Sequence, residues 1–218
     1  EKELFEKMRK GATPVTSLLP TAAYLEYFEP ILAEKDLLFL AFSSQMSATI
    51  NNIFEAREEL LKRYPERKFI VVDTLSISYP QTLLILRAHD MYMQGEPMEA
   101  VADWVTNNRL RAHAWLTVDD LVYLKRGGRV SATSAIFGSM LDIKPILTLT
   151  KAGKLEAVGK VQGRKKALRT IVDRVAENIE KPEEQEVIIL HGDAEEDALL
   201  LKDMLTARIP ELAGARPH

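Results

Sequence analysis

The 218-residue sequence contains no cysteine, so disulfides, thiolate metal sites and a cysteine nucleophile are all excluded. The absence of cysteine also fits a reducing compartment. The sequence has no large excess of charge of either sign, since 29 basic and 32 acidic side chains give a formal net charge of −3. We therefore expect neither nucleic acid nor an anionic membrane as the main partner, because both attract a surplus of positive charge.

Long apolar stretches are missing as well. None reaches the ~18 residues that a membrane-spanning helix needs, so we expect no stable insertion into a membrane. The first residues, EKELFEKMRKG, are charged and amphipathic, unlike a signal peptide. A soluble, cytoplasmic protein is the resulting expectation, and 218 residues fit one or two domains.

Motifs for catalysis and for cofactor binding are also absent. The sequence has no phosphate-binding P-loop, no dinucleotide-binding G-x-G-x-x-G and no G-x-S-x-G nucleophile elbow. Its four histidines nowhere pair at the four-residue spacing that places two metal ligands on one helix face. We therefore predict no cofactor, no metal and no catalytic residue.

What is present is an alternation of short apolar runs and helical patterns. DLLFLAF (36–42) and RKFIVVDT (67–74) each contain a continuous apolar run, as expected for strands that are covered on both faces. Between them, apolar residues recur at helical spacing from Gln45 to Tyr64. This order predicts a parallel α/β layer whose ligand edge lies at the carboxyl ends of the strands.

The pattern changes near Arg111. IKPILTLTKAGKLEAVGKV (143–161) predicts a β-hairpin that turns around Lys151–Gly153, SATSAIFGSML (131–141) predicts a small-residue helix, and EVIILHGD (186–193) predicts a further strand. The predicted fold class is therefore α/β. We expect a parallel α/β domain at 1–110, followed by an α+β domain with a partly antiparallel sheet at 111–218.

A cluster of hydroxyls follows the first apolar run. FSSQMSATINN (42–52) places Ser43, Ser44, Ser47 and Thr49, without any charge, at the predicted junction of strand and helix. Unpaired N–H groups at a helix start favour an anion, and hydroxyls add neutral donors. A carboxylate or phosphate could bind here. A plain helix cap made by Ser43 or Ser44 is the alternative, and it explains one or two of the hydroxyls but not all four.

Two further segments contain candidate residues. In VDDLVYLKRGGRV (118–130), Gly127 and Gly128 either allow close approach to a ligand or end a helix as a cap, and Arg129 lies beyond this break. QGRKKALR (162–169) is a basic helix start, where the helix dipole disfavours cations. It is either a solvated face or a patch that faces a phosphate-bearing partner.

In order and spacing, these segments resemble the DegV family of fatty-acid-binding proteins. The resemblance rests on TS at 16–17, FSSQMSATINN, VVDTLSIS at 71–78, VDDLVYLKRGGRV, GSMLDIKPIL and KVQGRKKAL, and it covers residues 1 to about 192. It implies one long-chain fatty acid buried between an α/β domain and an antiparallel-sheet domain. It also implies that a separate ATP-dependent fatty acid kinase subunit phosphorylates the acyl carboxylate. The present chain would then be a lipid-binding, non-catalytic subunit.

The resemblance implies roles for individual residues. Thr16 and Ser47 would hold the carboxylate through their hydroxyls, assisted by backbone N–H groups around Ala48, while Arg129 would lie close to the head group. Arg164 would face the kinase. The family usually has Ser-Gly-Thr where this chain has Ser-Ala-Thr, so Ala48 gives the backbone less freedom.

The family pattern also extends further at both ends. An early strand with an Asp-Ser-Thr segment and a later His-x-Gly-Pro-Gly segment are lacking, so we expect domain 1–110 to lack its N-terminal part and domain 111–218 its C-terminal part. Either the sequence is a piece of a longer chain, or those parts are missing.

Two other classes of function stay open at this point. One is an acyl hydrolase with Ser47 or Ser44 as nucleophile, which needs a histidine base. The other is an interaction module without a ligand, whose hydroxyls serve only as helix caps.

Overall fold

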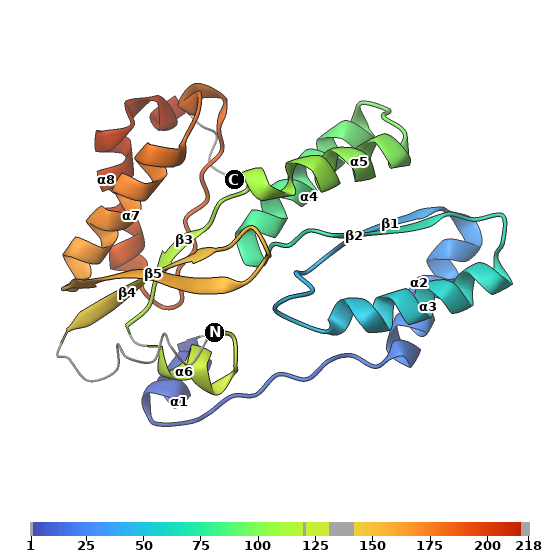
Figure 1. Cartoon of the computed structure of the whole chain (residues 1–218), viewed down its shortest axis with the longest axis horizontal. Helices are drawn as coiled ribbons and strands as arrows, with labels where there is room; N and C mark the ends of the chain where they lie inside the picture. Colours follow the sequence, from blue (N-terminus) through green and yellow to red (C-terminus); the bar gives the residue numbers. More distant parts are fainter. Residues whose placement is uncertain (1, 120, 131–141, 215–218) are drawn as a thin grey trace. The chain divides into compact units, whose positions relative to one another are not determined.

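The computed structural model describes residues 2–119, 121–130 and 142–214 (Figure 1). Contacts between residues divide the chain into two compact units. Unit 1 consists of Glu1–Val15, Trp115–Thr148 and Leu155–His218, and unit 2 of Thr16–Ala114 and Leu149–Lys154. In the part of the chain so described, no helix has the length and apolar character needed to cross a membrane.

Unit 2 is built on two parallel strands, β1 (Leu37–Ala41) and β2 (Phe69–Asp73), in which Leu37 lies opposite Phe69 and Ala41 opposite Asp73. Four helices accompany them: α2 (Thr21–Glu34), α3 (Thr49–Arg63), α4 (Ser78–Met93) and α5 (Met98–Asn108). A short 3-10 helix, η1 (Arg109–Arg111), follows α5. Because α3 carries the chain from β1 back to β2, both strands run in the same direction and end at the same edge.

Side chains of the two strands alternate between two apolar clusters, one on each face of the pair. The cluster with α2 and α3 contains Phe28, Leu32, Ile53, Leu60 and Phe69, joined by Leu37, Phe39 and Val71. The cluster with α4 and α5 contains Val72, Leu84, Ala88, Val101, Ala102 and Val105, joined by Leu38, Leu40 and Ile70. Odd-numbered residues at 37–40 and 69–72 thus face one helical layer and even-numbered ones face the other, which explains why both strands are apolar up to their carboxyl ends.

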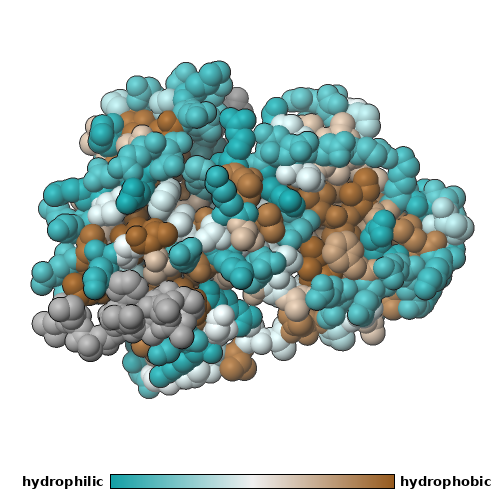
Figure 2. Space-filling model, in the orientation of Figure 1, coloured by the Kyte–Doolittle hydropathy of each residue, from teal (hydrophilic) through white to brown (hydrophobic). Residues whose placement is uncertain are grey.

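The surface view shows where this arrangement leaves apolar area exposed. Figure 2 shows apolar side chains gathered over β1 and β2, between the two helical layers of unit 2. Four of the five β1 residues are only half-buried. Helices cover the faces of the strand pair but not all of its edge.

Unit 1 contains a three-stranded sheet in the order β3 (Trp115–Thr117), β4 (Ile143–Leu149), β5 (Leu155–Gln162). β3 is antiparallel to β4, with Trp115 opposite Thr148. Helix α7 (Arg164–Asn178) contacts β3, β5 and α8 (Glu195–Arg208). Among its described residues, unit 1 also contains the helices α1 (Lys2–Arg9), α6 (Val122–Arg126), η3 (Pro182–Glu184) and η4 (Pro210–Gly214).

The predicted fold class is confirmed, since a parallel strand pair and a separate antiparallel sheet are both present. The predicted hairpin is confirmed as β4 and β5. The predicted strand at 186–193 is wrong, because this segment forms neither helix nor strand. The predicted helix at 131–141 lies outside the described residues. The domain boundaries 1–110 and 111–218 stay a prediction, since compact units defined by contacts do not establish domains.

Candidate functional site

The carboxyl ends of β1 and β2 lead into two loops that are hydrogen-bonded to each other. The N–H and the hydroxyl of Thr74 both donate to the Ala41 carbonyl, at 3.1 and 2.7 Å, and the Ser43 N–H donates to the Ser76 carbonyl at 2.8 Å. Thr74, Ser43 and Ser76 are 0%, 0% and 2% exposed. In open α/β sheets, ligands bind at this edge, beyond the carboxyl ends of the strands.

The loop between β1 and α3 folds into a tight turn that presents two neighbouring hydroxyls. The Ser43 carbonyl accepts the N–H groups of Met46 and Ser47, at 3.0 and 3.1 Å. The hydroxyls of Ser47 and Thr49 are hydrogen-bonded to each other at 2.7 Å, and Ser47 Oγ also accepts the Thr49 N–H at 3.3 Å. Both side chains are half-buried, so part of each stays in contact with solvent.

The start of α3 leaves one backbone donor beside this hydroxyl pair. Ala48 is the N-cap residue and makes no side-chain cap. Its N–H donates to no other residue that the structure describes. The alternative of a plain cap by Ser43 or Ser44 does not hold, because α3 begins only at Thr49 and, in the described chain, no hydrogen bond joins either hydroxyl to its first turn. Two hydroxyls and one amide therefore converge at the start of a 15-residue helix.

A third segment of unit 2 closes on these loops. The turn Thr150–Lys154 is held by the hydrogen bond from the Thr150 N–H to the Lys154 carbonyl, at 2.8 Å. Within it, the Gly153 carbonyl accepts the Ser43 hydroxyl at 2.7 Å. The hydroxyl of Ser43 therefore bonds to this turn, whereas the hydroxyls of Ser47 and Thr49 bond to each other.

Thr16 lies on a segment, residues 12–20, that forms neither helix nor strand, and its side chain is exposed. Asn52 of α3 donates to the Leu19 carbonyl at 2.7 Å and fastens this segment to the helix. No hydrogen bond joins the hydroxyls of Thr16 and Ser47 in the described chain. The structure brings Ser47, Ala48 and Thr49 together, and the role of Thr16 stays a prediction.

Arg129 follows the end of α6 in unit 1. Gly128 has φ +68°, its N–H donates to the Lys125 carbonyl at 3.0 Å, and the Arg129 N–H donates to the Leu124 carbonyl at 2.9 Å. These two bonds form the Schellman motif that commonly ends helices. The glycine pair therefore acts as a helix cap. Arg129 is exposed and its guanidinium donates to the Gly127 carbonyl, so its role at the head group stays a prediction.

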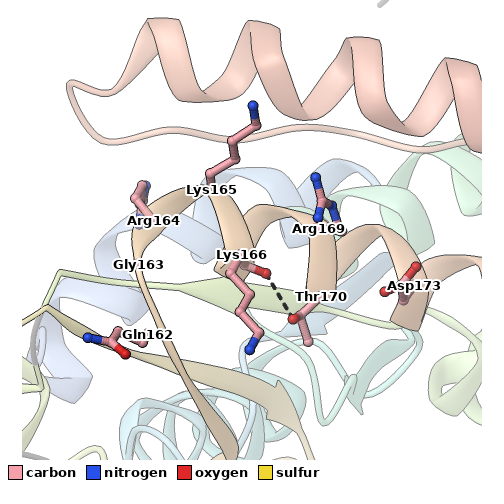
Figure 3. A pocket seen from close by; sticks show the side chains of 8 residues that line it. All are labelled: Gln162, Gly163, Arg164, Lys165, Lys166, Arg169, Thr170 and Asp173. Carbon is pink, nitrogen blue, oxygen red and sulfur yellow. Dashed lines mark hydrogen bonds between the residues drawn. The ribbon is translucent and has the colours of Figure 1, made fainter.

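Arg164 is the first residue of α7, and its Nε donates to Asp197 of α8 at 2.7 Å. Its Nη1 is buried and has no partner among the described residues. Arg164 lines a surface hollow of about 520 Å³ in unit 1 (Figure 3). Figure 3 shows Lys165 and Lys166 pointing in opposite directions from the start of the helix. The full lining is Gln162, Gly163, Arg164, Lys165, Lys166, Arg169, Thr170 and Asp173.

This hollow is strongly basic, because four of its lining side chains are cationic and one is acidic. Cations at a helix N-terminus are repelled by the helix dipole. An anion placed there would interact favourably with the dipole and with the cations. Among the described residues, no group of three or more His, Asp or Glu is arranged to hold a metal ion.

The sequence alone did not single out Thr49 and Gly153 among the hydroxyls and turn residues. Thr49 was part of the hydroxyl cluster, and its helical position next to Ser47 was the available signal. Gly153 had only the signal of a hairpin turn, because its neighbour Ser43 is 110 residues away in the sequence.

The chain matches a known protein family over nearly its whole length. The family model described as "Uncharacterised protein, DegV family" matches residues 1–215. The chain belongs to the DegV family. A DegV domain-containing protein of Clostridium perfringens is 39% identical over 210 residues, which are 96% of this chain and 72% of the relative. The resemblance that the sequence motifs indicated is thus confirmed.

Solved DegV structures share the fold. A DegV family protein from Thermus thermophilus, described by its fatty acid binding, is 34% identical with a TM-score of 0.70, covering 81% of this chain and 61% of that one. The fatty acid kinase (Fak) B3 protein of Streptococcus pneumoniae, loaded with linoleic acid, has a TM-score of 0.79 at 20% identity, covering 96% and 73%. This DegV chain therefore spans about three fifths to three quarters of these relatives.

Proposed function

We propose that this DegV chain binds a long-chain fatty acid and holds its carboxylate at the start of α3. The observation that supports this most is the pair of hydroxyls of Ser47 and Thr49, 2.7 Å apart, beside the N–H of Ala48, which has no partner among the described residues. Neutral donors at a helix N-terminus suit a single anion, because the helix dipole adds to their hydrogen bonds. The Thermus relative, which is 34% identical, is described by its fatty acid binding.

The family resemblance adds two more residues to the proposed head-group site. The hydroxyl of Thr16 is exposed and engages no other described residue, which leaves it free to donate. The guanidinium of Arg129 is exposed and would neutralise the carboxylate. Their roles rest on the family resemblance, whereas those of Ser47 and Ala48 also rest on local geometry.

We further propose that a separate ATP-dependent kinase subunit phosphorylates the bound acid and that this chain is its lipid-binding, non-catalytic partner. The kinase name of the Streptococcus pneumoniae protein supports such a partnership. The basic hollow around Arg164 supplies a surface that is complementary to an acidic or phosphate-bearing partner. In the described chain, Ser47 is hydrogen-bonded to Thr49 rather than to a histidine base, which argues against the hydrolase.

The ligand itself provides the first test. Mass spectrometry of the purified, denatured protein should release a long-chain fatty acid, and the emptied protein should bind one again in a titration. A protein that is empty and also fails to bind fatty acid would overturn the proposal. Ester turnover that disappears in Ser47→Ala would instead favour the hydrolase.

The head-group residues provide the second test. Ser47→Ala and Thr49→Val each break the hydroxyl pair, in which one proton lies between the two oxygens and the other is left to donate to the charged group, a bond that contributes about 1.5–3 kcal/mol. We expect each Kd for fatty acid to rise about 10- to 150-fold. Ser44→Ala is the matched control, because its hydroxyl lies in the same loop and, within the described chain, accepts a hydrogen bond from Gln45 Nε2 and from no other group. A Ser47→Ala protein that loses about 1 kcal/mol of stability but keeps its lipid would indicate a structural hydroxyl only.

A further inference from the structure

The hydroxyl of Ser43 belongs to the same cluster but is absent from the proposed head-group site. Ser43 is 0% exposed, and its Oγ donates to the Gly153 carbonyl at 2.7 Å while accepting the Gln45 N–H at 3.3 Å. A hydroxyl so enclosed and so engaged cannot touch a ligand. A buried serine that bonds across 110 residues needs another explanation than ligand contact.

The backbone of Ser43 connects this buried contact to the proposed carboxylate site. Its carbonyl accepts the Ser47 N–H at 3.1 Å and the Met46 N–H at 3.0 Å, which closes the turn just before α3. The Ser47 N–H is therefore used inside the turn, and the N–H of Ala48 is the one left for a ligand. The direction of both the Ser47 hydroxyl and the Ala48 N–H depends on where Ser43 is held.

The partner of Ser43 is a glycine for a steric reason. Gly153 is buried and has φ +80°, a backbone conformation that residues other than glycine rarely adopt. A Cβ on this residue would lie 2.5 Å from Ser43 Oγ and 3.0 Å from both Cα and Cβ of Leu75. Only a residue without a side chain lets the turn Thr150–Lys154 come this close to both loops at the strand ends.

We propose that Ser43 and Gly153 form a latch that positions the carboxylate donors. The latch holds the turn Thr150–Lys154 against the loop between β1 and α3, and so fixes the directions of the Ser47 hydroxyl and the Ala48 N–H. Ser43 and Gly153 are positioning residues and do not touch the ligand. This inference rests on the proposed function, because it concerns how the same carboxylate site is preorganised.

The test separates positioning of the anion donors from general damage to the protein. The Kd values of palmitic acid and of hexadecanol, which has the same chain without the carboxylate, are measured at a temperature where each variant is folded. The Kd of hexadecanol divided by the Kd of palmitic acid reports how strongly the site prefers the anion. Ser43→Ala should lower this ratio about 3- to 10-fold, the effect of one hydrogen bond. A ratio that stays unchanged in Ser43→Ala overturns the latch.

Thr74→Val is the matched control. It removes another fully buried hydroxyl of the strand-end loops, one that bonds to the Ala41 carbonyl and to the backbone of Ser76 rather than to the turn or to Ser47. It should lower stability and leave the ratio unchanged, and a ratio that falls equally in both variants would mean general loosening. If the unsubstituted chain does not bind palmitic acid at all, the proposed function itself fails.

A second variant approaches the latch from its other side. Gly153→Ala should also lower the ratio, because its Cβ displaces Ser43, and it decides the question if Ser43→Ala does not fold. In the double variant Ser43→Ala/Gly153→Ala, the 2.5 Å contact between the added Cβ and Ser43 Oγ is gone, while the contacts of this Cβ with Leu75 remain. The combined effect should therefore be smaller than the product of the two single effects. If the two substitutions change the ratio independently, Ser43 and Gly153 do not act together as a latch.

Discussion

Phe28 is the side chain whose removal should most weaken the attachment of α2 to the strands of unit 2. It is 3% exposed, and its ring centroid lies 5.4 Å from that of Phe39 on β1 and 5.1 Å from that of Phe69 on β2, both edge to face. Tyr24 of α2 stacks on it at 5.9 Å. Phe28→Ala removes a buried side chain, whose burial contributes about 1.5–3 kcal/mol, and aromatic ring pairs that contribute about 0.5–1.5 kcal/mol each. It also leaves a cavity. We expect unit 2 to lose about 3–5 kcal/mol of unfolding free energy.

The assay is urea denaturation together with hydrogen exchange measured on peptides of α2, which reports opening of this helix by itself. Phe28→Leu keeps most of the apolar volume and should cost about 1–2 kcal/mol, mainly through the lost ring pairs. Tyr27→Ala is the control, because Tyr27 also contacts the Phe28 ring, at 5.3 Å, but is 66% exposed. The reasoning is refuted if Phe28→Ala costs no more than Tyr27→Ala.

Two further predictions concern charged residues. Arg164→Gln should lower acyl phosphate formation with the kinase subunit about tenfold, as expected for one charge-assisted hydrogen bond, and leave the Kd for fatty acid unchanged. Arg174→Gln, on the same helix but outside the hollow, is its control, and equal loss in both variants would contradict a role for the hollow. The Lys68 hydrogen bond lowers the pKa of the exposed Glu99 carboxyl, and the same bond raises the pKa of Lys68. The stabilisation by this pair is therefore present between the unfolded pKa values of about 4.3 and 10.4. It is lost as the pH falls through the lowered pKa or rises through the raised one, so the small Tm difference between the chain and Lys68→Gln should vanish at both extremes.

The strands of unit 2 were predictable because each face of the pair has its own helical layer. A strand between two layers needs apolar residues at successive positions, and the continuous runs at 37–41 and 69–72 supply them. The same reasoning failed at 186–193. EVIIL is equally apolar, yet Leu190 is 58% exposed and no described strand pairs with this segment. A periodic or continuous apolar pattern indicates that a segment can form a strand, but the hydrogen-bonding neighbour decides whether it does.

The candidate site shows a second limit, which is the division of roles among chemically equal residues. The sequence indicated that the hydroxyls after β1 were too many for a cap and that an anion would fit them. Residue chemistry alone could not separate Ser43 from Ser47, because both are serines at one strand end, and only the family resemblance singled out Ser47. The separation comes from Gly153, whose missing side chain makes room for the Ser43 hydroxyl and turns it inward. Ser47, with no such neighbour, pairs with Thr49 and stays half exposed. We therefore expect a hydroxyl in such a cluster to become a ligand donor only where the rest of the fold offers it no carbonyl.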